Sequence, residues 1–84
     1  MTHGPDAAAA MIDYLRTHVL RDPSVTIDAS TPLISSGLVD SFALTDVLLQ
    51  LERVTRRRIP IGKIRPRDFE TVATMLAKAE QVGV

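Results

Sequence analysis

The sequence predicts an all-α domain, a small four-helix bundle with three longer helices, one short helix and a long loop after the first helix. The chain has only 84 residues, 45% of them are hydrophobic, and apolar residues recur at spacings of three and four. Such spacing is typical of amphipathic helices, and no segment shows the alternation of a half-buried strand. A chain this short forms one domain with a modest core. We therefore expect a single domain over residues 1–84, flexible at 1–5 and 82–84.

The first helix is expected to begin at Pro5 and Asp6 and to end near residues 20–22. Proline is favourable in the first turn of a helix, and Pro23 disfavours helical geometry in the residue before it. The apolar positions follow i, i+3, i+4, i+7 and i+11 spacing, which places them on one face. These positions are Ala8, Met11, Ile12, Leu15 and Val19.

Residues 22–39 are predicted to form a long loop, because they contain Pro23, Pro32 and Gly37 together with several serine, threonine and aspartate residues. A loop of this length is uncommon in a compact domain and is often functional. Apolar residues recur along it, so we expect it to be pinned across the helices. They are Ile27, Leu33, Ile34, Leu38 and Val39.

The second helix is predicted to begin at Ser41 and to run to about Arg57, with the carboxylate of Asp40 as its cap. Such a cap stabilises a helix by about 1 kcal/mol. One apolar stripe should face the core and consists of Leu44, Val47, Leu48, Leu51 and Val54. The opposite face should be exposed and consists of Phe42, Thr45, Asp46, Leu49 and Arg53.

The last third of the chain predicts a short helix followed by a longer one. Residues 59–62 interrupt the helical pattern, and Pro66 favours a short helical turn that runs to about Phe69. Thr71 is expected to cap the final helix. The inward-facing residues of that helix are predicted to be Val72, Met75, Leu76 and Ala79.

The composition excludes several classes of function. There is no cysteine, and therefore no disulfide, no thiolate metal site and no cysteine nucleophile. The chain has no glycine-rich phosphate loop and no metal-ligand spacing, and its two histidines, His3 and His18, do not complete a Ser-His-Asp set. His18 lies off the apolar stripe and is expected at the surface. The sequence therefore predicts a non-catalytic protein with no metal site.

The stretch of residues 33–42, Leu-Ile-Ser-Ser-Gly-Leu-Val-Asp-Ser-Phe, places a serine at the start of a helix after a long loop. A helix N-terminus carries partial positive charge and favours an anion there. Alone, the Asp-Ser pair is an ordinary helix start. Together with the helix order, the stretch resembles the attachment site of phosphopantetheine-dependent carrier proteins, the acyl and peptidyl carriers. Family members often have leucine where this chain has Phe42.

The resemblance implies a function for the chain. It implies a 4′-phosphopantetheine arm attached covalently to Ser41, with Asp40 as helix cap and as a recognition element for the transferase. It implies a free-standing acyl carrier protein that tethers acyl groups as thioesters, in a specialised pathway such as polyketide or nonribosomal peptide biosynthesis. An aminoacyl or peptidyl carrier is the near alternative, and a helical interaction module without a cofactor is the alternative of another class.

The resemblance also implies partners. They are a phosphopantetheinyl transferase, an acyl- or aminoacyl-activating ligase or an acyltransferase, and downstream biosynthetic enzymes. In carrier families the helix after the serine is the main recognition element. The exposed face with Phe42, Thr45, Asp46, Leu49 and Arg53 is therefore the expected docking face. Ala43 and Arg53 stand where acidic residues are frequent in fatty-acid carriers.

The charge distribution raises nucleic acid as a rival partner. Residues 1–52 contain seven acidic and two basic residues, a net charge of −5, whereas residues 53–84 contain eight basic and three acidic residues, a net charge of +5. The basic cluster within 53–67 has little aromatic interleaving, so nucleic acid is not expected as a partner.

No apolar run approaches a membrane span and no secretory signal is evident, so we expect a soluble, cytoplasmic protein. We also expect it to be a monomer.

Overall fold

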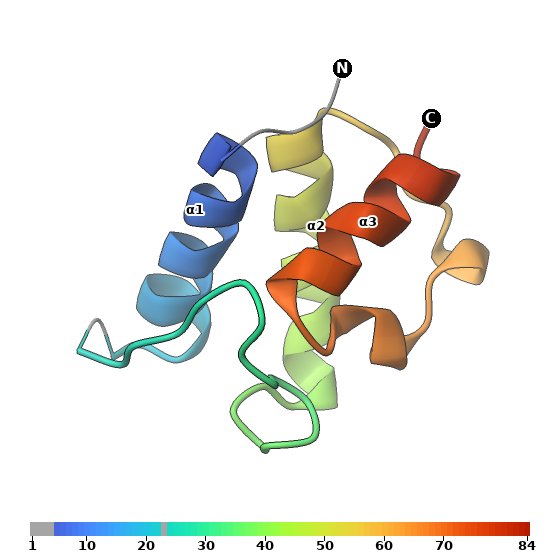
Figure 1. The fold of residues 1–84 in the computed structure, drawn as a ribbon. Coiled ribbons are helices and arrows are strands. Elements are labelled where there is room, and N and C mark those ends of the chain that lie inside the picture. Colours follow the sequence, from blue (N-terminus) through green and yellow to red (C-terminus); the bar gives the residue numbers. More distant parts are fainter. Residues whose placement is uncertain (1–4, 23) are drawn as a thin grey trace.

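The computed structural model describes residues 5–22 and 24–84, and within these residues it contains helices and no strand. Three longer helices form the domain, α1 (Pro5–Tyr14), α2 (Leu44–Thr55) and α3 (Val72–Val82). Each of the three contacts the other two. Figure 1 shows α1 and α2 side by side, with α3 crossing at an angle. The predicted all-α fold is confirmed.

The first helical segment ends where the sequence predicts. After Tyr14, α1 continues as a π-helical turn, η1 (Leu15–Val19), and the Leu20 N–H donates to the carbonyl of Leu15 at 2.7 Å. The segment then stops because Arg21 adopts a left-handed conformation with a φ of 54°. Met11 and Leu15 are fully buried, as expected for the apolar stripe.

The long loop is pinned by most of the apolar residues predicted to hold it. Ile27, Leu33 and Val39 are buried in the core, and Ile34 packs against it. The Ala73 N–H of α3 also donates to the carbonyl of Ala29 at 2.9 Å. Leu38 is the exception, because it lies at the loop tip and is 39% exposed.

The second helix turns the predicted apolar face toward the core. It opens with a 3₁₀ turn, η2 (Ser41–Ala43), and α2 follows without a break. The helix ends at Thr55, two residues earlier than expected, because Arg56 has a left-handed φ of 56°. Of the predicted stripe, Val47, Leu48 and Leu51 are buried, and Leu44 and Val54 are half-buried.

The connection from α2 to α3 contains two short 3₁₀ turns, η3 (Ile61–Lys63) and η4 (Pro66–Phe69). The second turn confirms the predicted short helix, whereas the first lies in the stretch that the sequence predicts only as an interruption. Thr71 caps α3 as predicted, and its hydroxyl accepts a hydrogen bond from the Thr74 N–H at 3.0 Å. Of the inward-facing residues predicted on α3, Val72, Met75 and Ala79 are buried and Leu76 is half-buried.

The two ends of the chain were predicted to be flexible. Residues 1–4, which include His3, lie outside the described residues, as does Pro23. At the other end, the Val84 N–H donates to the carbonyl of Arg58 at 2.9 Å, and the Arg58 N–H donates to the carbonyl of Val84 at 2.8 Å. Among the described helices, none is long and apolar enough to cross a membrane.

Candidate functional site

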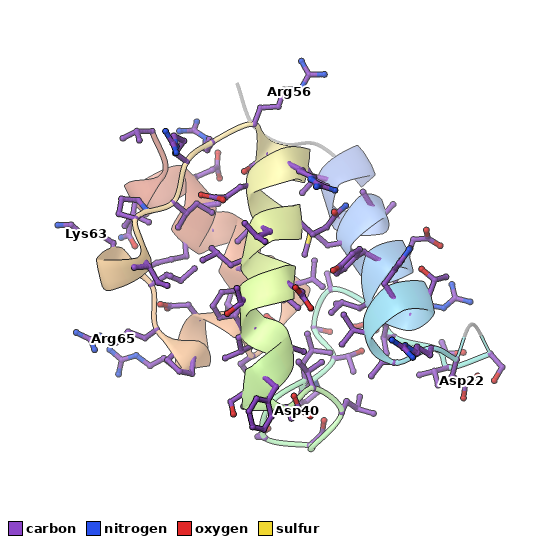
Figure 2. The ribbon with its side chains drawn as sticks, turned by 180° about the vertical axis from the view of Figure 1, so that it is seen from behind. Asp22, Asp40, Arg56, Lys63 and Arg65 are labelled. Atoms are coloured by element: carbon purple, nitrogen blue, oxygen red, sulfur yellow. The ribbon has the colours of Figure 1, made fainter. Side chains whose placement is uncertain are left out.

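The junction of Asp40 and Ser41 begins the second helix as predicted. Asp40 is extended, with φ −92° and ψ 171°, and its Oδ1 accepts a hydrogen bond from the Ala43 N–H at 3.1 Å. Ser41 is the first residue of η2 and is exposed. Figure 2 shows Asp40 at one end of α2 and Arg56 at the other. The candidate attachment residue therefore lies at the accessible N-terminal end of the central helix.

This end of the helix suits a negatively charged group. Residues 41–55 form one continuous helical segment, whose N-terminal N–H groups point away from the helix body. The summed peptide dipoles give that end about half a positive elementary charge. A phosphodiester on Ser41 Oγ fits both the exposure of the side chain and the sign of the local field.

The loop before Ser41 is closed upon itself. The Val39 N–H donates to the carbonyl of Leu33 at 2.9 Å, so residues 33–39 form a small loop with both ends buried. Its turn passes through Gly37, whose φ of 81° favours glycine. The Ser36 hydroxyl donates to the carbonyl of Pro32 at 2.6 Å. The closed loop therefore fixes the direction in which the chain runs into Asp40.

Glu70, between η4 and α3, fastens this loop. Its Oε1 accepts hydrogen bonds from the N–H groups of Ile34 and Ser35, each at 2.9 Å, and its Oε2 accepts one from the Ser35 hydroxyl. We call these three bonds the Glu70 clasp. They lower the pKa of Glu70 below its ordinary value of 4.5. The hydrogen bond from the Ser35 hydroxyl lowers the pKa of Glu70 most, and the bond from the Ser35 N–H lowers it next most. Partial burial raises the pKa, and the bond from the Ile34 N–H lowers it by a smaller amount.

The lowered pKa of Glu70 predicts acid sensitivity. Because the folded-state pKa is below the unfolded value, the clasp contributes stability above pH 4.5 and loses it as the pH falls through the folded pKa. Urea unfolding of the wild type should therefore show a loss of stability on acidification that is smaller in Glu70→Gln. The same replacement at the exposed Glu80 is the control for removal of a surface carboxylate. Equal pH profiles in the wild type and Glu70→Gln would contradict the assignment.

A groove of about 190 Å³ lies between the start of α2 and the two 3₁₀ turns. It is lined by Leu44, Thr45, Leu48, Ile61, Ile64, Arg65, Pro66 and Phe69. Leu44, the first lining residue of the groove along the chain, follows Ser41 by three residues, one turn of η2. Most of the lining side chains are apolar, so the groove suits a small apolar group. No pattern in the sequence predicts the groove.

The predicted docking face of α2 is exposed. Phe42 is 91% exposed and Leu49 is 52% exposed. Thr45, Asp46 and Arg53 are exposed as well. Ile61, in η3 across the groove, adds an apolar side chain that is 75% exposed and that no pattern in the sequence indicates.

The basic cluster does not form one surface. The Arg57 side chain donates to the carbonyl of Gly83 at 3.2 Å and is half-buried, so it holds the C-terminal segment. Figure 2 shows Arg56 beyond the C-terminal end of α2, whereas Lys63 and Arg65 project from the connection at its side. His18, the other residue considered for chemistry, is exposed as predicted and stacks on Tyr14 with ring centroids 5.1 Å apart.

Comparison with known proteins gives one informative relationship. No family model matches the chain. Over 72 residues the chain is 29% identical to the probable acyl carrier protein PigG of Serratia sp. (strain ATCC 39006). The matched region covers 86% of this chain and 83% of that protein, so the similarity extends over nearly the whole domain. It supports the carrier protein family that the stretch around Ser41 indicates.

Proposed function

We propose that this relative of acyl carrier proteins tethers acyl groups as thioesters on a 4′-phosphopantetheine arm attached to Ser41. The observation that carries the proposal is the exposed serine at the N-terminal end of α2, directly after the Asp40 cap. The arm supplies a thiol that accepts the acyl group, and the chain has no cysteine of its own to compete for it. The protein itself is then a substrate for partner enzymes and not a catalyst.

Each part of the site has a role in this proposal. Ser41 Oγ becomes the ester oxygen of the arm, and the helix N-terminus beside it stabilises the phosphodiester charge. Asp40 fixes the first turn, which holds Ser41 at a constant position for the transferase. The groove beside Thr45 and Leu48 offers an apolar surface within the same region.

The test of this function is an intact mass measurement. The purified chain is incubated with coenzyme A and a promiscuous phosphopantetheinyl transferase, and a known carrier protein serves as positive control. We expect the mass of one arm to be added per chain. A chain that stays unmodified while the positive control is modified would exclude the carrier function and favour the interaction module without a cofactor.

The name of the relative favours an acyl cargo over an aminoacyl or peptidyl one. Ala43 and Arg53 occupy positions that are frequently acidic in fatty-acid carriers, which favours a specialised biosynthetic pathway. Loading tests with acyl and with aminoacyl ligases separate the two kinds of cargo. Preferential loading by aminoacyl ligases would reverse the assignment while leaving Ser41 as the attachment residue.

The docking face is proposed to contact the loading enzyme through Phe42 and Leu49. Replacing either with alanine should leave the melting temperature nearly unchanged, because substitutions of exposed residues usually stay within about 0.5 kcal/mol. Loading should still fall by about tenfold in kcat/KM, since apolar anchors carry much of the energy of an interface. Steady-state loading kinetics and thermal melting measure the two effects.

Two controls define this experiment. Val84→Ala truncates an exposed apolar side chain beside Arg58, away from Ser41, and should not alter loading. The pair Arg56→Glu and Arg58→Glu reverses two exposed charges at the far end and spares the structural Arg57. If this pair abolishes loading while Phe42→Ala and Leu49→Ala do not, recognition lies at that end and the proposed docking face is wrong.

A further inference from the structure

We propose that Glu70 is a positioning residue for Ser41, which holds the loop before Ser41 in the shape that the arm-attaching enzyme recognises. The inference rests on the proposed function, because it concerns how Ser41 is presented for attachment of the arm. Glu70 and Ser41 are far apart in the sequence, and the link between them runs through the closed loop of residues 33–39.

The Glu70 clasp holds two consecutive residues, Ile34 and Ser35, and the backbone of Glu70 holds the residue before them. The carboxylate accepts from the N–H groups of Ile34 and Ser35 and from the Ser35 hydroxyl. The backbone carbonyl of Glu70 also accepts from the Leu33 N–H at 2.7 Å. One residue therefore fixes the position and the direction of the chain over residues 33–35. Hydrogen bonds to an ionised carboxylate are stronger than those between neutral groups.

The clasp is connected to Ser41 by a short series of contacts. The carbonyl of Leu33 accepts from the Val39 N–H, which joins the two ends of the closed loop. Val39 is buried and is followed directly by Asp40, whose carboxylate caps the turn that contains Ser41. A shift of Leu33 would therefore move Val39, and with it the cap of the helix.

The tip of the loop is held by local hydrogen bonds, from the Gly37 N–H to the carbonyl of Ile34 at 3.0 Å and from the Ser36 hydroxyl to that of Pro32 at 2.6 Å. Residues 35–38 are exposed, so core packing does not hold them. Glu70, in contrast, stands between the buried Phe69 and the capped start of α3. Figure 1 shows the loop passing beside the start of α3, where the Ala73 N–H also bonds to Ala29. Glu70 thus ties the loop, between its buried ends and just before its exposed tip, to the start of α3.

Loss of the clasp should reduce the fraction of molecules with the competent loop shape. The apparent affinity for the transferase then falls by that fraction, whereas the rate at saturation is retained. For Glu70→Ala we expect KM for arm attachment to rise about tenfold with kcat nearly unchanged, the scale of losing hydrogen bonds to a charged group. For Ser35→Ala, which removes one of the three bonds, we expect a rise of about threefold. The control is Glu80→Ala, which removes an exposed carboxylate from α3.

Amide hydrogen exchange measures how readily the loop opens, and it does so independently of attachment of the arm. In Glu70→Ala the amides of Ile34 and Ser35, which lose their acceptor, should exchange faster than in the wild type, while the amides of Val47 and Leu51 in α2 should not change. Thermal melting shows that each variant is folded at the assay temperature. If Glu70→Ala does not fold, Ser35→Ala decides the question with the same two measurements.

The outcomes separate this inference from the proposed function. Faster exchange at Ile34 and Ser35 with unchanged kcat and KM would overturn the positioning role and leave the carrier function intact. A fall in kcat alone, or an equal rise in KM for Glu80→Ala, would overturn it as well. A wild-type chain that accepts no arm would overturn the carrier function, and the inference with it.

Discussion

Replacing Ser41 with alanine should abolish attachment of the arm completely. The hydroxyl is the proposed acceptor, and the other two serines of the preceding segment are committed to the loop. The Ser35 hydroxyl donates to Glu70, and the Ser36 hydroxyl donates to the carbonyl of Pro32. Neither lies at a helix start, so neither should replace Ser41. Intact mass after incubation with coenzyme A and a transferase measures the loss.

The fold should survive this change. Ser41 is exposed, and substitutions at exposed positions alter stability by about 0.5 kcal/mol or less. Thermal melting of Ser41→Ala should therefore match the wild type. Ser30→Ala, at an exposed serine elsewhere in the long loop, is the matched control and should accept the arm normally. Labelling that persists in Ser41→Ala would remove the basis of the proposed function.

The second large effect is expected in the core. Leu51 is fully buried at the centre of α2, so Leu51→Ala should lower the free energy of unfolding by roughly 2–4 kcal/mol. A domain of this size has on the order of 5 kcal/mol in total. The melting temperature should fall by at least about 10 °C. Leu48→Ala should have a smaller effect within that range, because Leu48 borders the open groove.

The helix itself provides the control for this prediction. Leu49 is the same residue type and lies next to Leu48, but it is 52% exposed. Leu49→Ala should change stability by about 0.5 kcal/mol or less. Melting curves of the three variants therefore measure the orientation of α2. If Leu51→Ala melts like the wild type, the buried and exposed faces of the helix are wrongly assigned.

The parts of the structure that depend on local pattern were predictable from the sequence. The spacing of Val47, Leu48 and Leu51 is enough to orient α2, because helical periodicity places residues three and four apart on one face. Asp40 and Thr71 could be identified as caps because their side chains reach N–H groups only three residues away. The exposure of Phe42 and Leu49 follows from the same periodicity.

The parts that depend on distant contacts were not predictable. Glu70 and Ile34 are 36 residues apart, and no periodic pattern connects a carboxylate to a loop at that separation. The groove needs η3 and η4 to fold back against α2, which depends on tertiary packing. The early end of α2 was missed because a left-handed turn usually takes glycine, and here it takes Arg56. The basic residues within 53–67 are close together in the sequence, but Arg56 lies beyond the C-terminal end of α2 whereas Lys63 and Arg65 project from the connection at its side.

The separation of the charged residues gives the neutral chain a dipole moment. Figure 2 shows Lys63 and Arg65 on one side of the molecule and Asp22 on the opposite side. The longest dimension is 33 Å, which exceeds the Debye length of about 8 Å at physiological ionic strength. A charged surface therefore acts more strongly on the nearer side of the molecule than on the far side, so it turns the domain and attracts the side of opposite charge. Added salt should therefore reduce how strongly a charged enzyme surface orients the domain, even though the net charge of the domain is zero.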